Sequence, residues 1–213
     1  MFDKYVIPMF KPPLSRVAST LAMRGWAADR VTVIGFSLGM CCILALALGQ
    51  NTVALVFLLL NRLADGVDGE LARIKNPTDA GGFLDIALDF IFYALFPLGF
   101  AIADPANNAL PAAALIASFV GTGASFLAFA SMAAKHSIAH PEFGYKGLYY
   151  LDGLAEGTET VVFFVLMCLM PDRFAVLAWV FAAVCLVTAV NRVVFAYLTL
   201  RAVDQSRADV HDL

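Results

Sequence analysis

Apolar residues gather in six long stretches along this chain of 213 residues, and short polar breaks separate most of them. A helix that crosses a bilayer needs about 20 predominantly apolar residues, and each stretch comes close to that length. The pattern therefore predicts an all-α membrane protein with six transmembrane helices. The predicted spans cover residues 31–49, 52–74, 81–103, 109–134, 153–170 and 174–200.

The first 30 residues have a different pattern, in which apolar side chains recur on one helical face. Pro13 suits a first helical position and Gly25 a C-terminal cap, so we expect a helix over residues 13–24. Arg16 and Arg24 flank its apolar stripe, which favours an amphipathic helix lying at the membrane interface. An ordinary surface helix is the alternative. The stripe consists of Leu14, Val17, Ala18, Leu21 and Ala22.

Lysine and arginine indicate the orientation, because they are enriched in cytoplasmic connections. Of the 14 basic residues, 11 fall in segments that a six-span arrangement places on one side, and only Arg173 falls opposite. We therefore predict cytoplasmic termini in a bacterial-type inner or plasma membrane. The first apolar stretch begins only near Val31, so no cleavable signal peptide is expected. The predicted arm, six-helix transmembrane domain and tail are residues 1–30, 31–200 and 201–213.

The composition excludes several other classes of protein. Hydrophobic residues make up 61% of the chain and charged residues only 15%, whereas soluble domains have about 45–50% and 25%. Disorder is excluded by the low charge. The net charge of −3 argues against a nucleic-acid partner. The four cysteines lie in apolar stretches without a CxxC pair, so neither a disulfide framework nor a zinc site is expected.

Charged residues are expensive inside membrane spans, and the second and third spans contain four aspartates. Asp65 and Asp68 are three residues apart and share a helix face, and Asp85 and Asp89 are four apart and share another. A short turn joins the two helices, so we expect them to be adjacent and antiparallel. Both pairs then lie at a similar depth and form one pocket that opens toward the cytoplasm.

Clustered carboxylates need positive charge to remain ionised together. Oxygen ligands favour Mg²⁺ or Mn²⁺ over zinc, and paired metal ions on carboxylates are the usual means of transferring phosphoryl groups. Gly66, Gly69 and Gly81 leave room for a diphosphate to approach the backbone. The alternative is a set of buried ion pairs with Arg62, Arg73 and Lys75, but four or five anions exceed three cations. These residues therefore indicate a metal-dependent phosphotransfer site.

The two acidic segments resemble the signature of the CDP-alcohol phosphatidyltransferase family, D-x-x-D-G-x-x-A-R followed by G-x-x-x-D-x-x-x-D. In this chain the first half reads DGVDGELAR over residues 65–73, and the second half reads GGFLDIALD over residues 81–89. The spacer between them, residues 74–80, is seven residues long, where the family usually has eight. Six spans, an interfacial helix and cytoplasmic termini agree with the layout of the family.

The resemblance implies that an acceptor hydroxyl attacks the β-phosphorus of a CDP-activated donor and that CMP leaves. We expect CDP-diacylglycerol as the donor and an alcohol as the acceptor. A CDP-amine donor with diacylglycerol as the acceptor would use the same motif. The resemblance also implies a homodimer surrounded by membrane lipids.

The matching positions carry expected roles. Asp65, Asp68 and Asp85 would hold two Mg²⁺ ions. Asp89 would be the general base on the acceptor hydroxyl and a further metal ligand, because a base must reach the proton that it removes. The positions that would accommodate or support the nucleotide are Gly66, Gly69, Ala72, Arg73 and Gly81.

The start of the first span also resembles the family, whose entry reads A-N-x-V/I-T-x-x-G near the nucleotide. Here residues 28–35 read ADRVTVIG, so Asp29 stands where asparagine is usual. In this reading Thr32 hydrogen-bonds the cytosine. The alternative is equally favoured and purely structural, with a helix cap at the start and Gly35 as a packing residue.

The acceptor pocket is predicted from charges at the start of the fifth span. Glu156 and Glu159 share a helix face, and we expect them to line the pocket with Lys135 and Arg192 and to favour a cationic or polyol head group. Alternatively, these residues pair with one another as contacts between helices. A phosphorylated acceptor would need basic residues, for which Lys146 is a further candidate. Three loop residues would add cation–π contacts or form an interfacial belt: Tyr145, Tyr149 and Tyr150.

A transporter or channel for divalent cations is the competing class, because intramembrane carboxylates also form ion pathways. Against it, all four aspartates lie on two neighbouring spans and toward one side of the membrane. Mg²⁺-dependent binding of CDP would distinguish an enzyme from an ion carrier.

Overall fold

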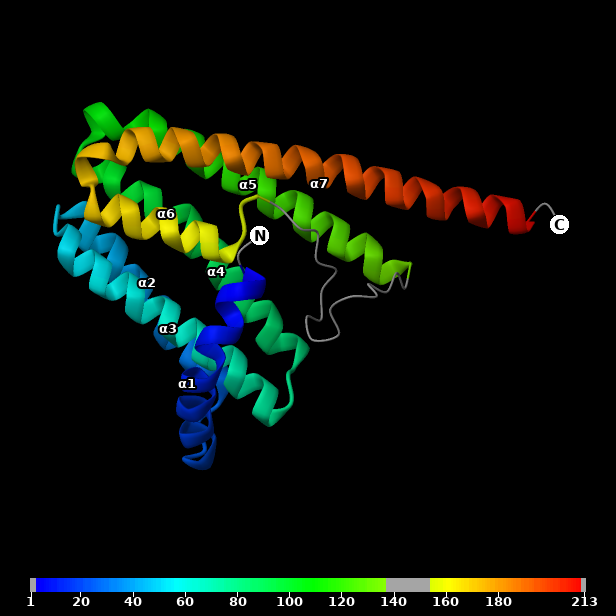
Figure 1. Ribbon diagram of the computed structural model, residues 1–213, viewed down its shortest axis with the longest axis horizontal. Helices are drawn as coiled ribbons and strands as arrows, with labels where there is room; N and C mark the ends of the chain where they lie inside the picture. The colour runs from blue at the N-terminus through cyan, green and yellow to red at the C-terminus, as the bar shows by residue number, and fades with distance from the viewer. Residues whose placement is uncertain (1–2, 137–153, 212–213) are drawn as a thin grey trace.

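The structure, a computed structural model, describes residues 3–136 and 154–211. In that part of the chain all regular elements are helices, and there is no β-strand (Figure 1). This confirms the predicted all-α class. The elements are α1 (Asp3–Met23), α2 (Ala28–Ala47), α3 (Asn51–Lys75), α4 (Asp79–Ala103), α5 (Pro105–Lys135), α6 (Gly157–Leu169), the short 3₁₀ helix η1 (Pro171–Arg173) and α7 (Phe174–His211).

Each of the six predicted spans corresponds to a helix, but only four have the length and composition of a membrane span. They are α2, α4, α5 and the segment Pro171–Gln205. Helix α3 carries Arg62, Asp65 and Asp68 in its middle, and α6 has 13 residues, about 20 Å of helix against a hydrocarbon core of about 30 Å. Helix α6 is therefore shorter than the predicted stretch 153–170, and the count of six spans stays a prediction.

The helices form one bundle that is closed by α6. Helix α2 packs against α3 and α4, α4 packs against α5, and α5 lies beside α7 along most of its length, while α6 contacts both α3 and α7 (Figure 1). Aromatic side chains fill the interior, with the rings of Phe96 and Phe164 stacked at a centroid distance of 3.8 Å. The buried phenylalanines of this core are Phe92, Phe96, Phe100, Phe119, Phe164, Phe174 and Phe181.

Helix α1 begins ten residues earlier than predicted. Pro8, Pro12 and Pro13 lie inside it, whereas Pro13 was expected to start it. A proline removes one helical hydrogen bond at a cost of about 3 kcal/mol, but its φ of about −65° matches helical backbone, so the helix continues through it. The predicted C-terminal cap is confirmed, because Gly25 has a φ of +79° and its N–H donates to the carbonyl of Ala22.

The apolar stripe of α1 contacts the bundle. Leu14, Ala18 and Leu21 pack with Val67 and Leu71 of α3, so most of the stripe faces protein, and Val17 remains 48% exposed. The predicted position of α1 at the membrane interface stays a prediction.

A close approach between α2 and α4 depends on Gly99. A Cβ atom added there would lie 2.7 Å from the Cβ of Leu46 and 3.0 Å from the carbonyl oxygen of Ile43, and overpacking costs typically about 1–3 kcal/mol. We therefore expect Gly99→Ala to lower the melting temperature by several degrees in detergent. Gly121→Ala is the matched control, because its added Cβ would make only an ordinary 3.6 Å contact with Ala189. Equal melting temperatures would contradict this packing.

Candidate functional site

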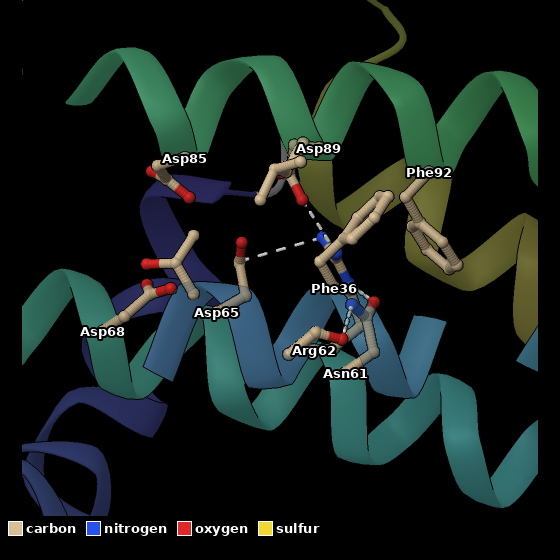
Figure 2. Close-up of a pocket in the computed structure, with 11 residues that line it drawn as sticks. Phe36, Asn61, Arg62, Asp65, Asp68, Asp85, Asp89 and Phe92 are labelled. Carbon is tan, nitrogen blue, oxygen red and sulfur yellow. Dashed lines mark hydrogen bonds and ion pairs between the residues drawn. The ribbon is translucent and has the colours of Figure 1, made fainter. Parts of the chain in front are cut away.

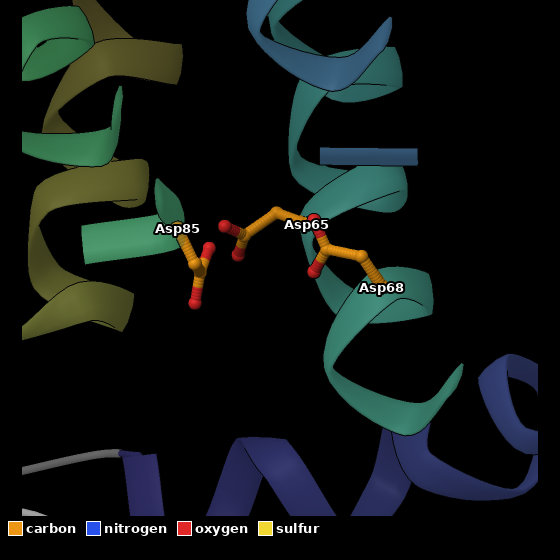
Figure 3. A group of neighbouring side chains, drawn as sticks. All are labelled: Asp65, Asp68 and Asp85. Carbon is orange, nitrogen blue, oxygen red and sulfur yellow. The ribbon is translucent and has the colours of Figure 1, made fainter. Parts of the chain in front are cut away.

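Three aspartates from two helices converge at one point. Asp65 and Asp68 extend from α3 and Asp85 from α4, and one carboxylate oxygen of each lies within 4.8 Å of the others (Figure 3). We call these residues the three-carboxylate cluster. Helices α3 and α4 run antiparallel here, as predicted (Figure 2). The prediction that they pack directly side by side is wrong, because α2 packs against both of them and α4 also packs against α5.

The cluster offers ligand atoms of the kind that bind hard divalent cations. All three ligands are carboxylate oxygens, and Asp68 is buried. Around an octahedral magnesium ion neighbouring oxygens are about 3 Å apart and opposite ones about 4.2 Å, so the three oxygens, which lie within 4.8 Å of one another, would draw closer together around a bound ion. The residues therefore fit a magnesium or manganese ion, which the sequence predicted.

The fourth predicted aspartate lies beside the cluster and has other partners. Asp89 Oδ1 accepts a hydrogen bond of 2.8 Å from Arg62 Nη2 (Figure 2). Asp89 Oδ2 accepts one of 3.4 Å from the hydroxyl of Tyr93. The pocket between Asp89 and the cluster holds about 10 Å³, which is about one water molecule. Asp89 therefore lines the same small pocket as the three carboxylates, but its hydrogen-bond partners are Arg62 and Tyr93.

Arg62 connects the two parts of the site. Its Nη1 lies 3.8 Å from Asp65 Oδ2 and 3.0 Å from the hydroxyl of Tyr93, and its Nε donates to Asn61 Oδ1 at 2.7 Å. Sequence analysis considered Arg62 only as a general counter-charge. The spacing from Arg62 to Asp65 was the available signal, because residues three apart share a helix face, whereas the partner on α4 was not readable from spacing.

A cavity of about 290 Å³ adjoins the cluster and shares Asp68 and Asp85 with it. Four residues that were predicted to contact the nucleotide line this cavity, namely Thr32, Gly69, Ala72 and Gly81. A Cβ atom added at Gly69 would meet no atom within 4 Å, so this glycine borders open space. The lining also includes Gly82, and it includes Asp29, Lys75, Asn76 and Thr78, which were not assigned to the nucleotide from the sequence.

Two other residues that were predicted to contact the nucleotide lie off the cavity wall. Gly66 faces α1, where an added Cβ would be 2.8 Å from Leu14 Cδ1, and Arg73 forms an ion pair with Glu70. At about 100° per residue, Gly66, Glu70 and Arg73 share one face of α3, and Gly69 belongs to the neighbouring face. The motif is therefore divided between a cavity face and a packing face.

The residues predicted for the acceptor pocket are spread over three helices. Glu156 and Arg192 are buried, and Arg192 Nη1 lies 3.4 Å from the carbonyl oxygen of Thr122. Glu159 lies in the first turn of α6, and Lys135 is exposed at the end of α5. The further candidates Lys146, Tyr145, Tyr149 and Tyr150 lie outside the described residues.

Thr32 is buried on α2 beside the cluster, and its hydroxyl donates to the carbonyl of Ala28 at 3.1 Å. The cap at the start of α4 is Thr78, whose side chain accepts from the N–H of Gly81 at 3.1 Å. The first turn of α4 thus forms part of the cavity wall, and helix N-termini favour anions.

Comparison with known proteins gives three results. The sequence profile described as CDP-alcohol phosphatidyltransferase matches residues 26–190. "Inner membrane protein YnjF" of Escherichia coli strain K12 is 51% identical over 205 residues, which are 96% of this chain and 100% of that protein. An archaetidylinositol phosphate synthase of Pyrococcus horikoshii is 32% identical over 96 residues, or 45% of this chain and 51% of the relative.

Among solved structures, Mycobacterium tuberculosis phosphatidylinositol phosphate synthase PgsA1 has the same fold. With CDP-DAG bound, it aligns with a TM-score of 0.65 at 19% identity, covering 86% of this chain and 93% of that one. Its complex with manganese and citrate aligns with a TM-score of 0.64 at 19% identity, covering 86% and 88%.

Proposed function

Because the chain belongs to the CDP-alcohol phosphatidyltransferase family of phospholipid-synthesising enzymes, we propose that it transfers a phosphatidyl group from CDP-diacylglycerol to an acceptor hydroxyl and releases CMP. The observation that carries this proposal is the three-carboxylate cluster, two members of which, Asp68 and Asp85, line a cavity of about 290 Å³. A diphosphate needs positive charge beside space for a nucleotide; a cation bound to the cluster would supply the charge and the cavity the space. The donor is further supported by PgsA1, which was solved with CDP-DAG bound.

In this proposal Asp65, Asp68 and Asp85 hold the metal ions, which we propose to be two Mg²⁺, with Mn²⁺ as a substitute. Bound metal would offset the charge of the diphosphate and of the transition state. The manganese complex of PgsA1 supports this choice of metal. Asp89 is the base that accepts the proton of the attacking hydroxyl.

The cavity is proposed to hold the cytidine diphosphate. Thr32, Gly69, Ala72 and Gly81 would contact the nucleotide because they line it, and we leave Gly66 and Arg73 out of the nucleotide site because they face elsewhere. The lining also includes Asp29 and Lys75, which offer an acceptor and a cation to the ligand.

Filling the cavity at Gly69 should weaken donor binding without unfolding the protein. We expect Gly69→Ala to raise the KM for CDP-diacylglycerol a few-fold and Gly69→Val to raise it roughly 10- to 100-fold, because the added methyl groups enter open space that the ligand needs. Melting temperatures in detergent should stay within about 2 °C of the wild type. An unchanged KM in Gly69→Val would contradict the proposal that the nucleotide binds in this cavity.

The acceptor is proposed to enter beside α5, α6 and α7. Glu156, Glu159 and Arg192 provide charge on these helices, with Lys135 at the end of α5. Two buried charged residues, Glu156 and Arg192, support a polar compartment in this part of the bundle, since charges are costly there without a purpose. We propose a polyol or cationic head group.

We place the protein in the bacterial inner membrane, which its apolar helices and the inner membrane protein of Escherichia coli support. In this proposal α2–α7 form the six-helix transmembrane unit, α1 lies at the interface, both termini and the site face the cytoplasm, and the active form is a homodimer. The exposed basic residues Lys11, Arg16 and Arg24 of the N-terminal arm support this orientation.

The experiment that tests the reaction is CMP release by purified protein with Mg²⁺. CDP-diacylglycerol is offered with a panel of polyols, amino alcohols and phosphorylated alcohols, and CDP-amines are offered with diacylglycerol. Acceptor-dependent release is expected in the first arm. CMP release only in the second arm would mean that the donor is a CDP-amine and the acceptor diacylglycerol. Failure of CDP to bind would favour cation transport. The stacked rings of Phe96 and Phe164 in the bundle interior argue against a continuous ion pathway.

A further inference from the structure

Helix α1 packs across the side of α3 that faces away from the three-carboxylate cluster. Asp65 and Asp68 are the two members of the cluster on α3. Gly66 and Val67 lie between them in the sequence. At about 100° per residue, the direction midway between Gly66 and Val67 is opposite the direction midway between the two aspartates. Val67 is buried and packs with Ala18 of α1, so α1 supports this turn of α3 on the side opposite the carboxylates (Figure 1).

The contact at Gly66 is closer than ordinary packing between side chains. A Cβ atom added to Gly66 would lie 2.8 Å from Leu14 Cδ1, 3.3 Å from Leu14 Cδ2 and 3.7 Å from Leu14 Cγ. The end of the Leu14 side chain therefore lies directly on the α3 backbone, in the space that a side chain at position 66 would take. A Cβ atom added to Gly69, about one turn further along α3, would meet no atom within 4 Å. The two glycines thus differ, because Gly69 borders the cavity and Gly66 receives Leu14.

Helix α1 is constrained on both sides of Leu14. Pro12 and Pro13 directly precede it inside the helix, and a proline fixes its own φ near −65°. At the other end, the N–H of Trp26 donates to the carbonyl of Leu21 at 3.0 Å, which closes the last turn as in a Schellman motif. The backbone that presents Leu14 to α3 therefore has few alternative conformations.

We propose that Leu14 is a positioning residue for the metal site, which holds the turn of α3 that carries Asp65 and Asp68 by packing on Gly66. This inference rests on the proposed function, in which these carboxylates bind the metal ions. Without metal, neighbouring carboxylates repel one another, and a glycine between them lets the backbone yield more easily than another residue would. Leu14 opposes this movement. The ligands are then in place before a cation arrives, and less ordering is needed when it binds.

The test compares Leu14→Ala with Leu21→Ala, which removes the same atoms from the same helix. Both leucines are partly buried and pack in the contact between α1 and α3, but Leu21 lies about 10 Å further along α1. We measure the Kd for Mn²⁺ by electron paramagnetic resonance in detergent, the Mn²⁺ dependence of CMP release and the melting temperature.

Leu14→Ala should weaken the metal site specifically. We expect its Kd for Mn²⁺ to be about 10-fold higher than that of wild type, which is the usual effect of losing a group that orients metal ligands. Its kcat at saturating Mn²⁺ should stay within about 3-fold of wild type, because excess metal fills the weakened site. Leu21→Ala should lower the melting temperature by a similar amount and keep the Kd for Mn²⁺ within about 2-fold, since distant sites act independently.

A double variant tests the contact itself. Gly66→Ala alone should raise the Kd for Mn²⁺ about 3-fold, because its methyl group displaces Leu14. In Leu14→Ala/Gly66→Ala the same methyl group occupies space that the leucine has left, so the Kd should return to within about 2-fold of wild type. The substitution at Gly66 thus weakens the metal site when Leu14 is present and restores it when Leu14 is truncated. A general loss of stability cannot produce this change of sign.

Three results would overturn the inference. They are an unchanged Kd for Mn²⁺ in folded Leu14→Ala, an equal rise of the Kd in Leu21→Ala, and a Kd in the double variant at or above that of Leu14→Ala. If Leu14→Ala does not fold, Leu14→Val decides: its Kd should rise about 3-fold, and an unchanged Kd contradicts the proposal. If wild type binds Mn²⁺ and releases no CMP, the proposed reaction fails, and the Mn²⁺ titrations still report whether Leu14 positions the metal ligands.

Discussion

Asp85→Asn is expected to lower kcat for CMP release at least about 1000-fold and to weaken Mn²⁺ binding about 100-fold. Asp85 is the contribution of α4 to the three-carboxylate cluster, and the other two members come from α3. The amide keeps the shape of the side chain and removes its negative charge. The two carboxylates that remain, Asp65 and Asp68, lie on neighbouring turns of α3, so a cation would be bound from one helix only.

The matched control is Asp79→Asn, which makes the same change on the same helix. Asp79 is exposed in the first turn of α4 and lies six residues before Asp85. We expect it to keep the Kd for Mn²⁺ and the kcat of wild type within about 3-fold, since an exposed charge at a helix N-terminus contributes only about 0.3–1 kcal/mol. Equal losses in both variants, or full Mn²⁺ binding in Asp85→Asn, would contradict the proposed metal site.

Helix periodicity predicted the centre of this site well. Asp65 and Asp68 had to share a face of α3, and Asp85 had to lie at the same depth on an antiparallel helix, because rise and turn per residue are nearly constant in helices. The structure brings these three oxygens together. Gly69 and Ala72, which the family resemblance assigned to the nucleotide, line the cavity beside the cluster. Regular geometry within an element therefore carries over from sequence to structure.

What periodicity could not predict is which neighbour each face meets. Gly66 was expected to face the nucleotide, but α1 covers it through Leu14. Arg62 is bound by Tyr93, Asp89 and Asn61, and two of these partners are about 30 positions away in the chain. Such contacts depend on how helices pack, and packing is set by side-chain shape over long range.

The predicted bounds of the fifth apolar stretch differ from those of α6 for a related reason. Hydropathy treats each stretch alone, so 153–170 was expected to be a full span, whereas α6 has 13 residues and packs against α3 and α7. The early start of α1 shows the same limit of local rules, because prolines that usually mark a helix start lie within this helix. In both cases contacts with neighbouring helices decide where the helix begins and ends, and rules based on the local sequence do not include these contacts.

Asp89→Asn should separate catalysis from binding more clearly than any other substitution in this chain. Because Asp89 lies outside the three-carboxylate cluster and Arg62 holds it at 2.8 Å, its charge contributes little to the metal site, and an asparagine oxygen can still accept from Arg62. The amide is not basic, so the acceptor hydroxyl loses its proton acceptor, which is worth about 100- to 10,000-fold in rate.

We therefore expect Asp89→Asn to lower kcat about 1000-fold, while the donor KM and the Kd for Mn²⁺ stay within about 3-fold of wild type. Asp85→Asn provides the contrast, since there metal binding and turnover should fall together. The decisive measurement is the Mn²⁺ titration of the two variants side by side. If Asp89→Asn loses Mn²⁺ as strongly as Asp85→Asn does, Asp89 is a metal ligand in the working enzyme. Its Oδ2 would then be the ligand, because Oδ1 accepts from Arg62 at 2.8 Å and a carboxylate has two oxygens that can bind separate partners.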